Sequence, residues 1–163
     1  MFSLYVRHAV PNNLSRRCNI IEELDFMEKY KFIEDLTSDV MFEAYGRDLK
    51  EVFTNAAEAM FTIICQAEKI KHEKSVKINA KAGSAKELMI AWLQELIAAV
   101  DTEEMFFSKF EILEIDEKHV KAKIHGETIT PEKGETVVKA VTYYKYKFEK
   151  MKKGYVARVS LDI

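Results

Sequence analysis

The sequence is poor in the residues on which several classes of protein depend. Of 163 residues, only two are cysteine, two are proline and five are glycine. Two cysteines, Cys18 and Cys65, are too few for a disulfide framework, so we expect a reducing, cytoplasmic compartment. The densest apolar stretch, 88–100, is interrupted by Gln94 and Glu95 and falls short of the roughly 18 residues that a membrane span needs. The sequence therefore excludes the disulfide-rich and membrane-spanning classes.

A large charge of one sign is missing as well. The 25 basic and 27 acidic side chains give a net charge of −2, and 48% of the residues are hydrophobic. That balance is typical of a globular protein, and the length suits a single domain. A nearly neutral chain does not hold nucleic acid by bulk electrostatics.

The common catalytic motifs are absent. There is no glycine-rich phosphate loop, no Cys-x-x-Cys, no His-Glu-x-x-His and no Gly-x-Ser-x-Gly. His119 and His125 stand among polar neighbours on expected strands, and we interpret them as surface histidines. The residues alone give no support to a classical enzyme.

The basic residues are divided unevenly along the chain. Three of the five arginines, Arg7, Arg16 and Arg17, fall within the first 26 residues, whereas the first of the 20 lysines is Lys29. Terminal segments without motifs are commonly poorly packed. We therefore interpret residues 1–26 as an N-terminal extension outside the domain, and predict a domain at 27–163 that starts naturally at Met27.

Apolar spacing predicts two helices among seven strands. Apolar residues three, four and seven positions apart predict one helix after the capping residue Asp48 and another after Ser84. Alternation of period two predicts strands near 30–35, 40–46, 76–80, 106–116, 119–128, 137–148 and 155–161. The order β-β-α-β-α-β-β-β-β predicts an α+β fold: a mixed or largely antiparallel sheet with both amphipathic helices packed on one face.

Two acidic segments could hold a cation. The turn at 35–39 contains Asp35 and Asp39, whose oxygens either satisfy turn amides or bind a hard cation; the spacing alone favours the turn. At the other segment, the sequence ends directly after an apolar strand, with Asp162 beside the terminal carboxylate of Ile163. Two such carboxylates repel each other unless a cation or a lysine neutralises them, or unless both point into water.

A basic segment precedes that end. Lys139 interrupts the apolar, β-rich run 136–144, which places it at a sheet edge or a pocket. Between Lys139 and Arg158 there are seven basic residues and one acid, Glu149. This run is typical of a solvated strand face, and it is also compatible with a basic patch that contacts phosphate.

From Tyr30 to Ile163 the chain resembles the archease family, the small protein partners of the RtcB-type tRNA-splicing ligase. The similarity covers the whole domain, in the family's order and spacing, and excludes residues 1–26. Each stretch is weak by itself, but together they are specific. They are FIEDLTSDVMFEAYG (32–46), LKEVFTNAAEAMF (49–61), WLQELIAAVDTEEMFFSKF (92–110), VKAVTYY (138–144) and ARVSLDI (157–163).

The resemblance implies a non-enzymatic cofactor that promotes guanylylation and multiple turnover of the ligase and meets tRNA only indirectly. It also implies a divalent cation held by Asp39, Asp162 and the carboxylate of Ile163, with Lys139 acting at the ligase. Oxygen donors without sulfur or imidazole favour Ca²⁺, Mg²⁺ or Mn²⁺ over Zn²⁺. The chain departs from the family at Leu36, where many members have a histidine, so any role of that imidazole is absent.

Two other functions stay open at this stage. A small metal-dependent phosphohydrolase could use the same carboxylates, although the sequence offers no evident nucleophile or general base. A general modulator or chaperone of RNA- or DNA-processing proteins would bind partners other than the ligase.

Overall fold

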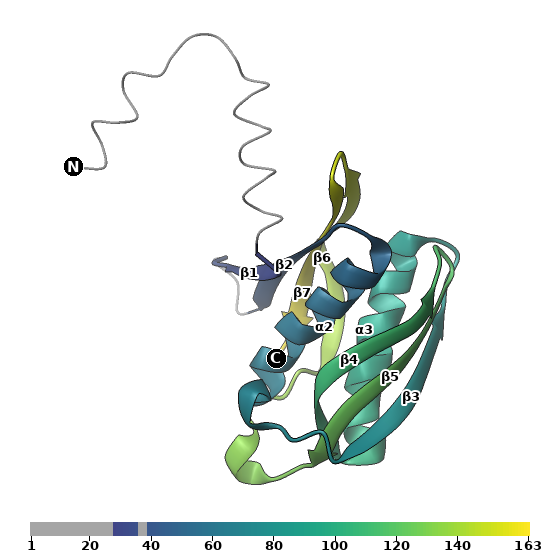
Figure 1. The fold of residues 1–163 in the computed structure, drawn as a ribbon. Helices are drawn as coiled ribbons and strands as arrows, with labels where there is room; N and C mark the ends of the chain where they lie inside the picture. The colour runs from purple at the N-terminus through teal and green to yellow at the C-terminus, as the bar shows by residue number, and fades with distance from the viewer. Residues whose placement is uncertain (1–27, 36–38) are drawn as a thin grey trace, which may run out of the picture.

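The computed structural model describes residues 28–35 and 39–163, and these follow the predicted order of elements (Figure 1). The predicted extension at 1–26 lies outside the described residues, so it stays a prediction. The elements are β1 (Tyr30–Ile33), β2 (Val40–Gly46), α2 (Leu49–Ile64), β3 (Lys74–Lys81), α3 (Ala85–Glu103), β4 (Met105–Ile115), β5 (His119–Thr128), β6 (Ala140–Met151) and β7 (Gly154–Asp162).

The α+β class is confirmed, but the prediction of a single sheet needs a correction. The strands form two antiparallel sheets, ordered β1-β2-β7-β6 and β3-β5-β4. Each helix packs against strands of both sheets, so the two sheets share one core (Figure 1). Alternation along a strand shows which of its faces is buried, but it does not identify the neighbouring strand. For this reason the sequence could not separate the two sheets.

Both predicted helix caps are present. The carboxylate of Asp48 accepts a hydrogen bond from the Glu51 amide at 2.8 Å, and the hydroxyl of Ser84 accepts one from the Glu87 amide at 3.3 Å. Each bond satisfies an amide that the first helical turn leaves without a partner. These local signals fix where α2 and α3 begin.

The core lies where the helices meet the sheets. Its largest fully buried side chains include Trp92, Phe42, Phe53, Phe61 and Phe107. The indole of Trp92 donates a hydrogen bond to the Phe53 carbonyl at 3.1 Å and so joins α3 to α2. Each such side chain stabilises the fold by about 1.5–3 kcal/mol through removal of apolar area from water. Cys65 is also buried, and burial raises the pKa of its thiol to about 12.

The joint between β2 and α2 requires a glycine. A Cβ atom at Gly46 would collide with the backbone of Val52, in the first turn of α2. The strand and the helix can therefore approach closely only without a side chain there. Gly46 also pairs with Tyr155 of β7, so this close approach positions Arg47 and Asp48 beside the β6–β7 hairpin.

Among the residues that the structure describes, no helix is both long and apolar enough to cross a membrane.

Candidate functional site

Strand pairing brings the predicted site residues to one end of the four-stranded sheet. Val40 of β2 pairs with Leu161 of β7, so Asp39 and Asp162 each lie one residue beyond that pair, at the same end. Ala140 of β6 pairs with Asp162, and the Lys139 amide donates a hydrogen bond to the Asp162 carbonyl at 2.8 Å. We call Asp39, Lys139, Asp162 and Ile163 the carboxylate tip.

The side chain of Lys139 lies beside the last residue of the sequence. Its Nζ is 3.5 Å from the main-chain oxygen of Ile163, and both residues are exposed. Lys139 precedes the edge strand β6 and lines a cleft of about 610 Å³ whose walls include Val137 and Phe106. The expectation that Lys139 stands at a sheet edge or a pocket therefore agrees with its position in the structure.

The two aspartates of the tip are available to a ligand. Both are half-buried, and within the described part of the chain neither Asp39 nor Asp162 makes a salt bridge. Asp35, by contrast, accepts a hydrogen bond from Lys145 Nζ at 3.0 Å, which raises the pKa of that lysine. The neighbouring departure at Leu36 lies outside the described residues.

The donor chemistry of the tip fits a hard cation. The tip brings together two aspartate side chains, both with oxygen donors, from the ends of adjacent strands. Within the described residues, no three His, Cys, Asp or Glu side chains form a group that could hold a metal ion; the third ligand that the family resemblance implies is the carboxylate of Ile163. The cation stays a prediction.

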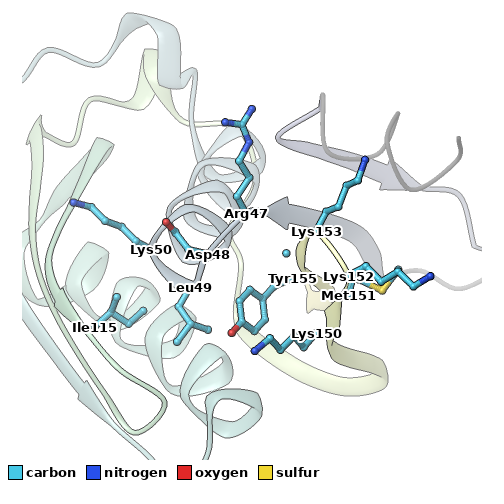
Figure 2. Close-up of a pocket in the computed structure, with 11 residues that line it drawn as sticks. Arg47, Asp48, Leu49, Lys50, Ile115, Lys150, Met151, Lys152, Lys153 and Tyr155 are labelled. Carbon is cyan, nitrogen blue, oxygen red and sulfur yellow. The ribbon is translucent and has the colours of Figure 1, made fainter. Parts of the chain in front are cut away.

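A basic pocket lies at the opposite end of the same strand pair, where Gly46 pairs with Tyr155. The pocket measures about 590 Å³ and is formed by the β2–α2 joint, the end of β4 and the β6–β7 hairpin (Figure 2). Its charged lining comprises five cations, Arg47, Lys50, Lys150, Lys152 and Lys153, and one acid, Asp48. Three of these lysines belong to the basic run noted in the sequence, but nothing there indicated that Arg47 and Lys50 would join them.

Residues 30–163 match the model of the Archease protein family (MTH1598/TM1083). The chain belongs to the archease family. Its relatives include the proteins named archease from Methanosarcina acetivorans, 39% identical over 142 residues, and from Sulfurisphaera tokodaii, 36% identical over 141. The alignments cover 83% and 84% of this chain, and 97% and 100% of the relatives.

Solved structures of archease relatives share the fold. The solution structure of Methanobacterium thermoautotrophicum protein 1598 is 34% identical, with a TM-score of 0.64 over 83% of this chain and 99% of that one. A crystal structure from Thermotoga maritima, described as an archease and possible chaperone, has a TM-score of 0.58. That alignment covers 82% of this chain and 96% of the other; at 17% identity it supports the fold alone.

Between the two ends, this archease-family chain contains an ion pair that sequence reasoning missed. Glu43 is only 8% exposed; it accepts hydrogen bonds from Arg158 at 2.7 Å and from the Tyr45 hydroxyl at 2.6 Å. Burial by itself raises the pKa of Glu43, but the bonds from Tyr45 and Arg158 together with the nearby charge of Lys31 lower it below its usual value. Glu43 and Arg158 are directly paired on β2 and β7, a relation that only the strand register shows.

Proposed function

We propose that this chain is a non-enzymatic protein cofactor of an RtcB-type RNA ligase and acts in cytoplasmic tRNA splicing and RNA repair. In this role it promotes guanylylation of the ligase and supports multiple turnover. Membership of the archease family supports the proposal. The structural observation that carries it is the convergence of Asp39, Asp162 and Lys139 at one exposed end of a sheet.

Asp39, Asp162 and the terminal carboxylate of Ile163 would hold Ca²⁺, Mg²⁺ or Mn²⁺ at this tip. Carboxylates brought together on neighbouring strand ends repel each other, and Lys139 reaches only the Ile163 end of the group. A divalent cation would neutralise the remaining charge and could stabilise negative charge on a nucleotide phosphate.

Lys139 supplies a second positive charge at the tip. Its side chain is exposed, and its amide is fixed to the Asp162 carbonyl, so the lysine projects from a defined point of the sheet edge. When the tip docks near the nucleotide pocket of the ligase, the ammonium of Lys139 would contact phosphate oxygens. Asp39 and Asp162 would serve to hold the cation, and the chain itself would transfer no group.

The test is guanylylation of the ligase with and without this protein, measured as GMP transfer to the ligase. We expect Asp39→Ala to abolish stimulation because the cation loses a ligand, and residues appended after Ile163 to abolish it because they convert the terminal carboxylate into an amide. Asp116→Ala is the matched control, since Asp116 lies outside the tip and its carboxylate accepts a hydrogen bond from the Lys118 amide of a turn. Full stimulation by the Asp39→Ala variant and by the extended chain would overturn the proposal.

Release of phosphate by the purified protein alone would favour a phosphohydrolase instead.

A further inference from the structure

The basic pocket is assembled from parts of the chain that are far apart in the sequence. Arg47 and Lys50 come from the β2–α2 joint, whereas Lys150, Lys152 and Lys153 come from the β6–β7 hairpin. Gly46 pairs with Tyr155, and Lys150 pairs with the same tyrosine from the other side, so the strand register brings the two groups together. The cations therefore gather through the fold and belong to more than one local run.

Four of these positive charges make no salt bridge in the part of the chain that the structure describes. They belong to Arg47, Lys50, Lys150 and Lys152. Of the nearby acids, Asp48 caps α2 at 2.8 Å from the Glu51 amide, Glu51 accepts a hydrogen bond from the Arg47 amide at 2.7 Å, and Glu149 pairs with Lys147 at 3.1 Å. Several like charges around one hollow repel each other, and a bound anion would relieve that repulsion.

The rest of the lining is apolar and aromatic. Leu49, Ile115 and Met151 line the pocket together with Tyr155. The Tyr155 ring lies 5.8 Å from the Phe148 ring, centroid to centroid, and Lys150 Nζ lies 5.9 Å from the Tyr155 centroid, so neighbouring side chains hold the ring in place. The pocket has a volume of about 590 Å³ and is broadly open to solvent. Cations beside a fixed aromatic ring suit a ligand that combines phosphate with a flat base.

We propose that this pocket binds single-stranded RNA, with backbone phosphates among the cations and one base against Tyr155. In Figure 2, the side chains of Arg47, Lys50 and Lys152 point in different directions around the pocket. That spread suits the successive phosphates of a strand better than the single phosphate group of a free nucleotide. Base stacking on an aromatic ring is tolerant of sequence, and lysine and arginine contacts to phosphate add affinity that depends on salt.

The pocket is separate from the carboxylate tip. The seven residues of β2 connect the two ends, and six steps of about 3.3 Å place them about 20 Å apart. RNA bound here would leave Asp39 and Lys139 free to contact a protein. The inference goes beyond the proposed function, in which RNA is met only through the ligase, and it does not depend on that function.

The test measures binding of a fluorescent, unstructured RNA of about 12 nucleotides to the full chain by anisotropy over a range of salt concentrations. The pocket variant combines Arg47→Ala, Lys150→Ala and Lys152→Ala. The sheet variant, its control, also removes three charges but from the outer face of the three-stranded sheet, through Lys77→Ala, Lys81→Ala and Lys123→Ala. Each variant loses three positive charges, so the two variants have the same net charge as each other. A difference between their affinities for RNA therefore depends on where the charges lie.

We expect the pocket variant to bind this RNA about 10-fold or more weakly at ~0.1 M salt and to reduce the salt slope by about 2, as loss of three phosphate contacts predicts. The sheet variant should stay within about twofold of the unmodified protein. Absence of RNA binding by the unmodified protein, or an equal loss in both variants, would overturn the proposal. Competition with GTP gives a further test, in which pyrophosphate at the same total charge is the control. If GTP displaced the RNA and pyrophosphate did not, the pocket would be a mononucleotide site and the proposal would be overturned.

The Tyr155 contact can be tested separately from the charges. Tyr155→Leu should weaken RNA binding by about fivefold or more without changing the salt slope, whereas Tyr155→Phe should stay within about twofold. A thermal melt establishes that both variants are folded. When guanylylation of the ligase is assayed without RNA, the pocket variant should stimulate that step as the unmodified protein does. Failure of RNA binding and failure of ligase stimulation are therefore distinguishable.

Discussion

The two ends of the β2–β7 strand pair carry opposite charge. At the end marked by Val40 and Leu161, Asp39 and Asp162 lie beside each other without a salt bridge among the described residues. At the end marked by Gly46 and Tyr155, five cations line a pocket with one acid, whose carboxylate caps a helix. The net charge of −2 averages over both ends and describes neither.

This contrast limits what net charge can exclude. A nearly neutral chain gives no long-range attraction for nucleic acid, but a local cluster still acts over a Debye length of about 8–10 Å. The two ends are about 20 Å apart by the rise of β2. At physiological salt this distance exceeds the Debye length, so the charge at one end has little effect on a ligand bound at the other. One small domain can thus present a site for a cation and a site for an anion.

The largest effect that we expect is stabilisation by a divalent cation, and it tests the contrast between the two ends of the strand pair. With Ca²⁺ or Mn²⁺ at about 100 times its dissociation constant, the free energy of unfolding should rise by about 2.7 kcal/mol, or roughly 5–10 °C in melting temperature for a chain of this size. Asp39→Asn should remove most of this shift in a thermal melt because it removes a charged ligand. The pocket variant, whose changes lie at the other end, should keep it.

If the cation raised the melting temperature of the Asp39→Asn variant as much as that of the unmodified protein, the cation would not be bound by Asp39 at the carboxylate tip. Loss of the shift in the pocket variant would contradict the separation of the ends.

A smaller effect is expected at Glu43, which lies between the two ends. Glu43→Gln should lower the free energy of unfolding at pH 7 by about 2 kcal/mol, since it leaves Arg158 without its carboxylate partner. The pKa of Glu43 is lowered in the folded state, so its contribution is present above the usual value of about 4.5. It is lost as the pH falls through the lowered pKa. Urea denaturation between pH 7 and pH 3 should show a flatter profile for the variant.

The Glu43→Gln variant should still lose some stability in acid because of Glu127. The pKa of Glu127 is lowered mainly by its hydrogen bond with Lys133. Glu114→Gln is the matched control, because Glu114 makes an exposed salt bridge with Lys121. That control should change stability by less than about 1 kcal/mol. An identical pH profile for Glu43→Gln and the unmodified chain would show that the central ion pair does not stabilise the sheet.

How far the sequence predicts each region depends on how local its signals are. Asp48 and Ser84 cap helices through bonds to residues three positions on, so the cap positions were predictable and are confirmed. The strand order was not, because β7 lies between β2 and β6 although it is last in the chain. The sequence placed Asp39, Lys139 and Asp162 together only through a family resemblance. The meeting of Arg47 with Lys150 depends on strand register and had no signal in the sequence.

The smallest expected effect concerns Asp35, the other aspartate of the turn that precedes β2. Lys145→Gln removes its salt-bridge partner, whose side chain is 49% exposed, so stability should fall by no more than about 1 kcal/mol. Because Asp35 is paired with Lys145 and is not one of the proposed ligands, the affinity for Ca²⁺ should change by less than about threefold in calorimetric titration. Lys147→Gln, which breaks the exposed pair with Glu149, is the control. If Lys145→Gln changed cation affinity as much as Asp39→Asn does, the cation site would have to include Asp35, and the carboxylate tip would extend into the turn.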